Sequence, residues 1–563
     1  MKNSKLTYYW IAALLPITFL LSCKKNFLDK PPIDSIVDAN FYKTDEQVLA
    51  GTGLLYSKVW FDYNDKASYN LGDFRAGTAF SAYNDRGNVL FNTTGNTPEN
   101  GSSWRSFFIV VGQSNLAITN INQYAGAGVS PQIKKMAIAE ARFMRALAYR
   151  FLVMNWGPVP IIEDNLKLLS DTSKARNTEK SVWKFITSEM RGAAEDLPLT
   201  PIRPGRLTKW AAEGMLARFY LTRAGVEANG SGTRNQVFLD SAKYYAERVI
   251  KSSGASLLKN YSDLFLYPYD NNSESLFSLQ WVYSPGAWGT QNSTPAYLAY
   301  SPDIANGDGW GGDKGATWWM MKQYEGFTPT ANDDTLKGRT LDQRLKATFM
   351  LPGTRYNEIT QTVPVTVNPA LKQKLIFPFN GTDNNFLSIK KYVTGKAEDV
   401  GGQSASQYYG NDTYMMRLAE MYLVYAEASL GNSASTTDTK TLEYFNKVHM
   451  RAGLPEYILP LTEDQIFKER FVEFAVEGMA WYDLVSLHYY NKAKAYTILN
   501  SQDRGLFFTA PDKFPDPTLW TFAKTKWATT DRTINANDGN FLLPIPAAEL
   551  AQAPNLLKPA VDY

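Results

Sequence analysis

The chain has 563 residues, of which 44% are hydrophobic and 20% are charged, the balance of a large globular protein rather than of a disordered or multispan membrane chain. Its formal net charge is +3, and Lys2 and Lys5 are the only charged residues of the first 22, so the remainder carries +1. Such a chain has little long-range attraction for nucleic acid, and we expect no nucleic-acid partner.

The N-terminus has the pattern of an export signal. Lys2 and Lys5 precede an apolar segment over residues 8–21, which is too short for a membrane-spanning helix. The sequence Leu-Leu-Ser-Cys at residues 20–23 resembles the bacterial lipobox. We therefore expect residues 1–22 to be a lipoprotein signal peptide and Cys23 to carry the lipid anchor. An ordinary secretory signal is the alternative. Cys23 is the only cysteine, which excludes an internal disulfide and a catalytic thiol elsewhere.

Helical patterns dominate the mature chain up to about residue 254. Thr44 and Gln47 form a capping box that predicts a first helix. Apolar residues at helical spacing predict a long helix over residues 131–155. A second helix from about Thr208 has large and small residues spaced 4, 3 and 4, and a partner helix follows around residues 242–249.

The pattern of paired helices returns after residue 405. Residues 418–429 repeat the 4, 3, 4 spacing, with a partner at 441–451. Alternating small and large residues on paired helices predict tetratricopeptide-like hairpins. A last long helix is expected to begin at Thr462, capped by Gln465, and to run towards Leu487.

The segment from about 255 to 405 differs in composition and is rich in Gly, Asn, Asp, Pro and Tyr. One strand is predicted over residues 275–283 and another over residues 362–367. The remainder is expected to form long loops, which in compact proteins are usually functional or disordered, and its aromatic content argues against disorder. The tail after residue 490 is again rich in loops.

Several sequence blocks, taken together and in order, resemble landmarks of the SusD/RagB family. Each block alone could be a chance helix, but the ordered set spans nearly the whole chain. Phe471 and His449 depart from the family pattern at positions where arginine is common. The blocks lie at residues 27–32, 140–149, 156–160, 206–212, 417–423, 426–428, 445–448, 451–455, 469–478, 481–484 and 543–550.

The resemblance implies a mainly α protein in which tetratricopeptide-like hairpins scaffold an irregular, loop-rich lobe with a few short strands. It implies a lipoprotein of the outer membrane that faces the cell exterior, acts as the lid of a SusC-like TonB-dependent transporter, and captures glycan without catalysis or cofactor. The expected organisation is a signal peptide (1–22), an N-terminal helical region (23–254), a loop-rich ligand-binding lobe (255–404), tetratricopeptide-like helices (405–490) and a loop-rich C-terminal segment packing on the core (491–563).

Aromatic residues in the loop-rich lobe are the first candidates for a glycan site, because sugar C–H faces stack on aromatic rings. Trp310 lies in a glycine-rich stretch and Trp288 is also flanked by glycines, so both are expected in exposed loops. Trp318 and Tyr297 complete this set. Trp318 is adjacent to Trp319, so at least one of the two is expected to point inward. Packing in the core is the alternative for each ring.

A second candidate region covers residues 72–92. Asp73, Arg75, Tyr83 and Asn84 offer carboxylate, guanidinium, aromatic and amide groups for sugar hydroxyls. In the family that the chain resembles, this region lies near both ligand and transporter. A solvated loop is the alternative.

Two clusters of acidic residues give weaker indications of a functional site. Glu469, Glu473 and Glu477 lie at successive i,i+4 positions and suggest a glycoside hydrolase, but nearby Lys468 and Arg470 are expected to pair with them. A second cluster hints at calcium without the spacing of an EF-hand loop; it comprises Asp303, Asp308 and Asp313. We expect no catalytic residues and no metal. A surface glycoside hydrolase, or the same family with a peptide or glycoprotein cargo, remains the alternative.

Overall fold

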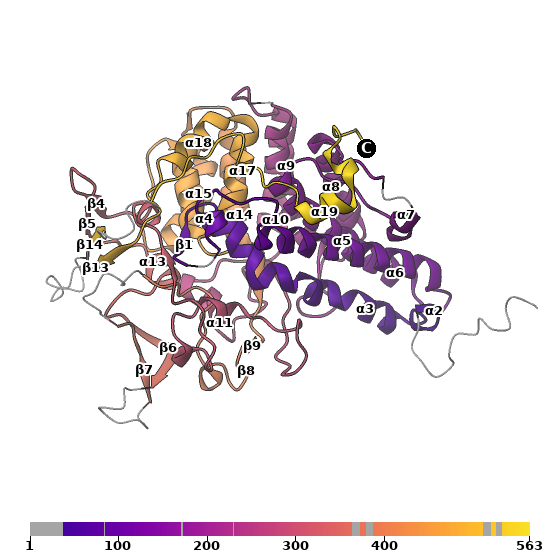
Figure 1. Cartoon of the computed structure of the whole chain (residues 1–563), viewed down its shortest axis with the longest axis horizontal. Coiled ribbons are helices and arrows are strands. Elements are labelled where there is room, and N and C mark those ends of the chain that lie inside the picture. The colour runs from indigo at the N-terminus through magenta and orange to yellow at the C-terminus, as the bar shows by residue number, and fades with distance from the viewer. Residues whose placement is uncertain are drawn as a thin grey trace, which may run out of the picture.

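The computed structural model describes residues 38–83, 85–170, 173–228, 230–362, 372–378, 387–509, 520–524 and 532–563. Helices are its main regular element, and the strands are short. Figure 1 shows the helices of the first half gathered beside those that follow residue 418, while the segment that carries β6 to β9 forms a lobe with long connections. The expected mainly α fold with a loop-rich lobe is confirmed.

The helices are α2 (Asp38–Phe41), α3 (Asp45–Gly53), α4 (Arg86–Val89), α5 (Pro98–Tyr124), α6 (Pro131–Trp156), α7 (Asn165–Ser170), α8 (Glu179–Asp196), α9 (Lys209–Val226), α10 (Gln236–Ser252), α11 (Thr294–Leu298), α12 (Trp318–Met321), α13 (Arg344–Thr348), α14 (Leu418–Leu430), α15 (Thr439–Arg451), α16 (Glu463–Glu473), α17 (Ala480–Tyr490), α18 (Lys492–Asn500) and α19 (Ala547–Gln552). Short polar side chains begin several of them. The capping box at Thr44 is confirmed, and Thr208 and Thr462 cap α9 and α16 by accepting from the backbone N–H three residues on. These caps satisfy donors that would otherwise be unpaired at a helix start.

Consecutive helices pack against each other as the paired patterns predicted. Helix α8 packs on α6 and α9, α9 packs on α10, and α14 packs on both α10 and α15. Small residues permit the close approach: a Cβ at Gly214 of α9 would lie only 2.5 Å from the Met416 sulfur. The result is a continuous helical scaffold whose core includes the fully buried Trp183 and Trp481.

The strands are β1 (Ala79–Ser81), β2 (Ser275–Leu279), β3 (Lys314–Ala316), β4 (Phe327–Pro329), β5 (Thr335–Gly338), β6 (Arg355–Thr362), β7 (Lys372–Ile376), β8 (Ser404–Ala405), β9 (Tyr408–Tyr409), β10 (Thr413–Arg417), β11 (Ser435–Thr436), β12 (Leu461–Thr462), β13 (Phe507–Thr509) and β14 (Trp520–Lys524). The strand expected over 275–283 is shorter than predicted, because β2 ends at Leu279, opposite Thr413 of β10. The strand expected over 362–367 lies almost entirely outside the described residues; only Thr362 is described, as the last residue of β6. One four-stranded antiparallel sheet has the order β13-β14-β5-β4.

The prediction of one long helix from Thr462 to Leu487 is wrong, because the chain breaks between α16 and α17. At the break, Val476 has φ 62° and Gly478 has φ 71°, which are left-handed conformations that end a helix. The buried carboxylate of Asp73 accepts hydrogen bonds from both backbone N–H groups, at 2.7 Å from Val476 and 2.8 Å from Gly478. A residue 400 positions earlier in the sequence therefore fixes this turn.

A buried network of ion pairs joins the loop-rich lobe to the C-terminal helices. Arg417 donates to Glu274 at 2.7 Å, to Glu473 at 2.9 Å and to Glu477 at 2.8 Å. Arg344 donates to Glu469 at 2.6 Å. The three glutamates are thus structural, but the partners we expected for them are wrong: Arg470 instead pairs with Asp483 at 2.6 Å.

Candidate functional site

One cavity brings together aromatic rings from separate segments of the loop-rich lobe. Its volume is about 450 Å³. Three of the predicted binding residues line it, namely Trp288, Tyr297 and Trp310. The other lining residues are Asp65, Lys66, Asp85, Glu99, Lys314 and Gln407.

Trp310 is presented by a loop that is pressed against α11. Trp310 is 58% exposed. Its backbone N–H donates to the Ala296 carbonyl at 2.9 Å. The next residue, Gly311, comes so close to α11 that an added Cβ would lie 2.0 Å from the Leu298 carbonyl oxygen. Glycine at this position lets the loop dock tightly while the indole stays in solvent, as the Gly-rich pattern predicted.

Trp288 forms the second exposed ring. The residue is 53% exposed, and its indole is supported by edge contacts with Phe61, at a centroid distance of 5.3 Å, and with Tyr408, at 5.8 Å. A ring supported at its edges and open to solvent on the cavity side can stack on a flat apolar ligand surface without losing much conformational freedom.

Polar groups lie between the rings. The Tyr297 hydroxyl donates to Asp85 Oδ2 at 2.5 Å, and its ring stacks on Tyr69. Asp65 accepts from the Ser293 hydroxyl at 2.6 Å, and its burial raises the pKa of that carboxyl. Carboxylates whose remaining lone pairs face a cavity are acceptors for ligand hydroxyls. The cavity thus combines stacking surfaces with hydrogen-bond acceptors.

Three predicted binding residues are buried in the interior instead, and their assignment to the site is wrong. Trp318 is fully buried, with its Nε1 3.3 Å from the carboxylate of Asp333. Asp73 holds the turn between α16 and α17, and burial raises its pKa to about 6. Arg75 donates to the carbonyls of residues 540 and 541 and contacts the ring of Phe91. Their polar groups are used within the fold.

Tyr83 lies in the neighbouring loop after β1 and is 82% exposed. It does not line the cavity, but its backbone N–H donates to Asp313 Oδ2 at 3.3 Å, which links its loop to the strand that follows Trp310. Asn84 and Cys23 lie outside the described residues, so their predicted roles stay predictions.

Sequence reasoning missed several polar residues of the cavity. Asp65 and Lys66 lie on a π-helical turn (Tyr63–Ala67), Gln407 joins β8 to β9, and Lys314 begins β3. Glu99 lies in the first turn of α5. These residues come together through tertiary packing, and none has a local sequence signal that would mark it as part of a site.

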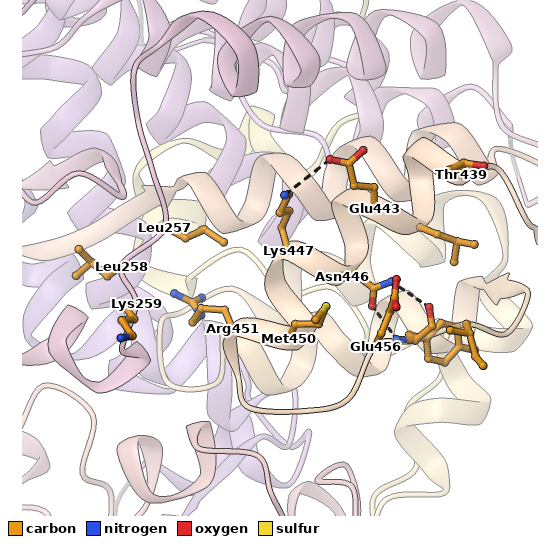
Figure 2. Close-up of a pocket in the computed structure, with 13 residues that line it drawn as sticks. Leu257, Leu258, Lys259, Thr439, Glu443, Asn446, Lys447, Met450, Arg451 and Glu456 are labelled. Carbon is orange, nitrogen blue, oxygen red and sulfur yellow. Dashed lines mark hydrogen bonds and ion pairs between the residues drawn. The ribbon is translucent and has the colours of Figure 1, made fainter.

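A larger groove lies on the helical scaffold, with a volume of about 850 Å³. Figure 2 shows Glu443, Lys447 and Met450 along α15, with Leu257 and Lys259 beside the end of that helix that carries Arg451. Its lining residues include no tryptophan, and its one aromatic residue, Tyr457, packs on Phe445. It therefore lacks the pair of exposed rings that distinguishes the smaller cavity.

Metal chemistry has little support in the described part of the chain. No group of three or more His, Cys, Asp or Glu residues there is arranged to hold a metal ion. The three aspartates considered for calcium have separate partners: Asp303 accepts from the Thr362 backbone, Asp308 from Ser406, and Asp313 from Lys314. No helix in this part of the chain combines the length and apolar character that a membrane span requires.

A helical scaffold that presents exposed aromatic rings beside hydrogen-bond acceptors has the groups needed to bind a carbohydrate. Residues 273–561 match the SusD family, and residues 26–221 match a family described as starch-binding and associating with the outer membrane. A SusD-like protein of Bacteroides ovatus is 35% identical over 100% of this chain and 98% of its own length. The chain belongs to the SusD family.

Solved structures agree in fold. A crystal structure with xylogluco-oligosaccharide has a TM-score of 0.78 and 32% identity, covering 92% of this chain and 99% of that one. A laminarin-binding SusD-like protein has a TM-score of 0.62 and 20% identity, covering 91% and 98%; it supports the fold alone. The resemblance drawn from the sequence blocks is confirmed.

Proposed function

We propose that this protein captures a xyloglucan-type β-glucan at the cavity between Trp288 and Trp310 and delivers it, without cleaving it, to a SusC-like TonB-dependent transporter. The observation that carries the proposal is that these two half-exposed indoles line one cavity that also holds carboxylate acceptors. The choice of glycan is supported by the relative of 32% identity whose crystal structure contains xylogluco-oligosaccharide.

The physical basis is stacking on a preformed surface. The axial C–H groups of a sugar ring form an apolar face that matches an indole, and the supporting contacts of Phe61 and Tyr408 limit the entropy lost when Trp288 engages. An open cavity with two stacking rings buries only part of a long polysaccharide. We therefore expect a Kd on the order of micromolar to millimolar.

The cellular setting belongs to the same proposal. A lipid on Cys23 would hold the protein at the outer membrane, facing the exterior, where it would act as the lid of the transporter. The lipobox-like residues 20–23 and the family description of association with the outer membrane support this arrangement.

Binding of purified residues 24–563 to xyloglucan, laminarin and starch tests the proposal, by affinity electrophoresis and by calorimetry. We expect retardation by xyloglucan, no release of reducing ends, and at least about a tenfold loss of affinity in Trp288→Ala and in Trp310→Ala. Tyr244→Ala is the matched control, because Tyr244 is 53% exposed on α10 and lies outside the cavity. Retention of full affinity by both tryptophan variants would move the site elsewhere, and release of reducing ends would favour a hydrolase.

A further inference from the structure

Lys314 is a buried lysine in the wall of the cavity. It is 1% exposed, and its ammonium donates to Asp313 Oδ1 at 2.7 Å and to the Trp310 carbonyl at 2.9 Å. The same nitrogen lies 4.5 Å from the centre of the Tyr297 ring. The ammonium thus contacts three groups, and two of these groups belong to cavity residues.

Asp313 carries the connection to a second loop. Its other carboxylate oxygen, Oδ2, accepts from the Ser81 hydroxyl at 2.7 Å and from the Tyr83 backbone N–H at 3.3 Å. Strand pairing adds to this link, because Ser81 of β1 lies opposite Lys314 of β3. The adjacent residues Asp313 and Lys314 therefore join the loop of Tyr83 to the loop of Trp310.

The Trp310 loop is held from two sides. On the side of α11, Trp310 N–H donates to Ala296 O and Gly311 N–H donates to Ala299 O. On the side of β3, the side-chain contact is the ammonium of Lys314 on the Trp310 carbonyl. The Lys314 backbone N–H also donates to the Gly311 carbonyl at 3.0 Å, so the ammonium adds a side-chain attachment at Trp310 to a backbone bond at the next residue.

The charge of Lys314 is unnecessary for packing alone. Burying an ammonium costs free energy unless it is paired and hydrogen-bonded, so an apolar side chain of similar length would fill the same space at lower cost. What the ammonium adds is a directed attachment to a carbonyl, a carboxylate and a ring face.

We propose that Lys314 is a positioning residue of the binding site, whose ammonium holds the loop of Trp310 and, through Asp313, joins it to the loop of Tyr83. The inference rests on the proposed function, because it assigns Lys314 a role in the geometry of that glycan site. It predicts that Lys314 acts on affinity through Trp310 and has no effect when that ring is absent.

The test is a double-mutant cycle between Lys314 and Trp310. Lys314→Met removes the cation that offsets the buried charge of Asp313, so the main variant is Asp313→Asn with Lys314→Met, which removes both charges and keeps an acceptor for Ser81. Calorimetry with a xylogluco-oligosaccharide should show about a tenfold loss of affinity, as expected for one orienting charged hydrogen bond. In a Trp310→Ala background the same pair of changes should cause no further loss.

A second measurement separates this inference from the proposed function. Hydrogen exchange of residues 299–313, without ligand, should quicken at the amides of Trp310 and Gly311 in the Asp313→Asn, Lys314→Met variant. The matched control is Asp333→Asn with Lys322→Met, which removes a Lys–Asp pair at 3.1 Å outside the cavity and should change neither exchange in this segment nor affinity.

The possible outcomes distinguish the role of Lys314 from the existence of the glycan site. Unchanged exchange and affinity in the Asp313→Asn, Lys314→Met variant, in a protein that binds the oligosaccharide and loses it on Trp310→Ala, would overturn the role of Lys314 and keep the site. Losses that multiply in the cycle would also overturn it. A wild-type protein that binds no glycan would overturn the proposed function and this role with it.

Discussion

Glu473 provides the sharpest test of how the scaffold is held together. It is fully buried and faces three guanidinium groups: Arg344 at 3.1 Å, Arg417 at 2.9 Å and Arg451 at 2.5 Å. Burial alone would raise the pKa of this carboxyl, but Arg451 and Arg417 outweigh burial and lower the pKa from 4.5 to about 2. Removing the charge in Glu473→Gln leaves those arginines short of a partner.

The magnitude follows from that pKa. Each tenfold change in a protonation equilibrium is worth about 1.4 kcal/mol, so the shift in the pKa of Glu473 corresponds to about 3 kcal/mol of stability at neutral pH. This agrees with the cost of about 3–5 kcal/mol for breaking a buried ion pair. Because the folded-state pKa is lowered, the contribution is complete above pH 4.5 and is lost as the pH falls towards 2.

Urea unfolding followed by tryptophan fluorescence measures the effect. Glu473→Gln should lower the free energy of unfolding by about 3 kcal/mol at pH 7, and the difference from wild type should shrink below pH 4.5. Glu443→Gln is the matched control: its side chain is 57% exposed and lies 3.8 Å from Lys447, so it should cost less than about 0.5 kcal/mol. A loss below about 1 kcal/mol for Glu473→Gln, or a loss that does not change with pH, would refute the reasoning.

Three further outcomes are expected. Gly72→Ala should cost more than about 2 kcal/mol, because its Cβ would lie 2.3 Å from the Gly478 backbone, whereas Gly101→Ala, with open space, should not destabilise; equal unfolding curves would contradict this. Trp318→Phe should reduce stability but keep glycan affinity in calorimetry, since its ring is buried. A carboxymethylated form of the bound glycan should be retarded less than the neutral form, because the carboxylates of the cavity outnumber its ammonium groups: Asp65, Asp85 and Glu99 stand against Lys66 and against Lys314, whose charge Asp313 offsets. The difference should disappear at about 1 M salt, and equal retardation at low salt would argue against this reasoning.

Local patterns were enough to predict much of the scaffold. The capping box at Thr44, the start of a helix at about Thr208 and the helical spacing over residues 131–155 each depend on residues within a few turns, and each is confirmed. The break between α16 and α17 was not predictable in this way, because its cause is the distant carboxylate of Asp73.

The predicted binding residues show the same contrast between local patterns and distant contacts. Glycines beside Trp288 and Trp310 marked those rings as exposed, and both are. Trp318 has no glycine beside it and is buried. The segment with Asp73 and Arg75 resembled a polar loop in the sequence, but both side chains are buried and their polar groups bond within the fold. Lys314 and Asp65 enter the cavity only through folding, so no local pattern distinguished them.

The contacts that hold the loops of Trp288 and Trp310 are separate from the ion pairs that join the lobe to the helices, which has a consequence for how such a protein can diversify. Val282 N–H donates to Thr290 O across the first loop, and Trp310 N–H donates to Ala296 O beside the second. The residues that bind the lobe to the helices, Glu274, Arg344 and Lys391, lie outside both loops. Exchange of either loop would leave those ion pairs in place, so a change of carbohydrate preference can be made in one loop while the framework that carries it stays the same.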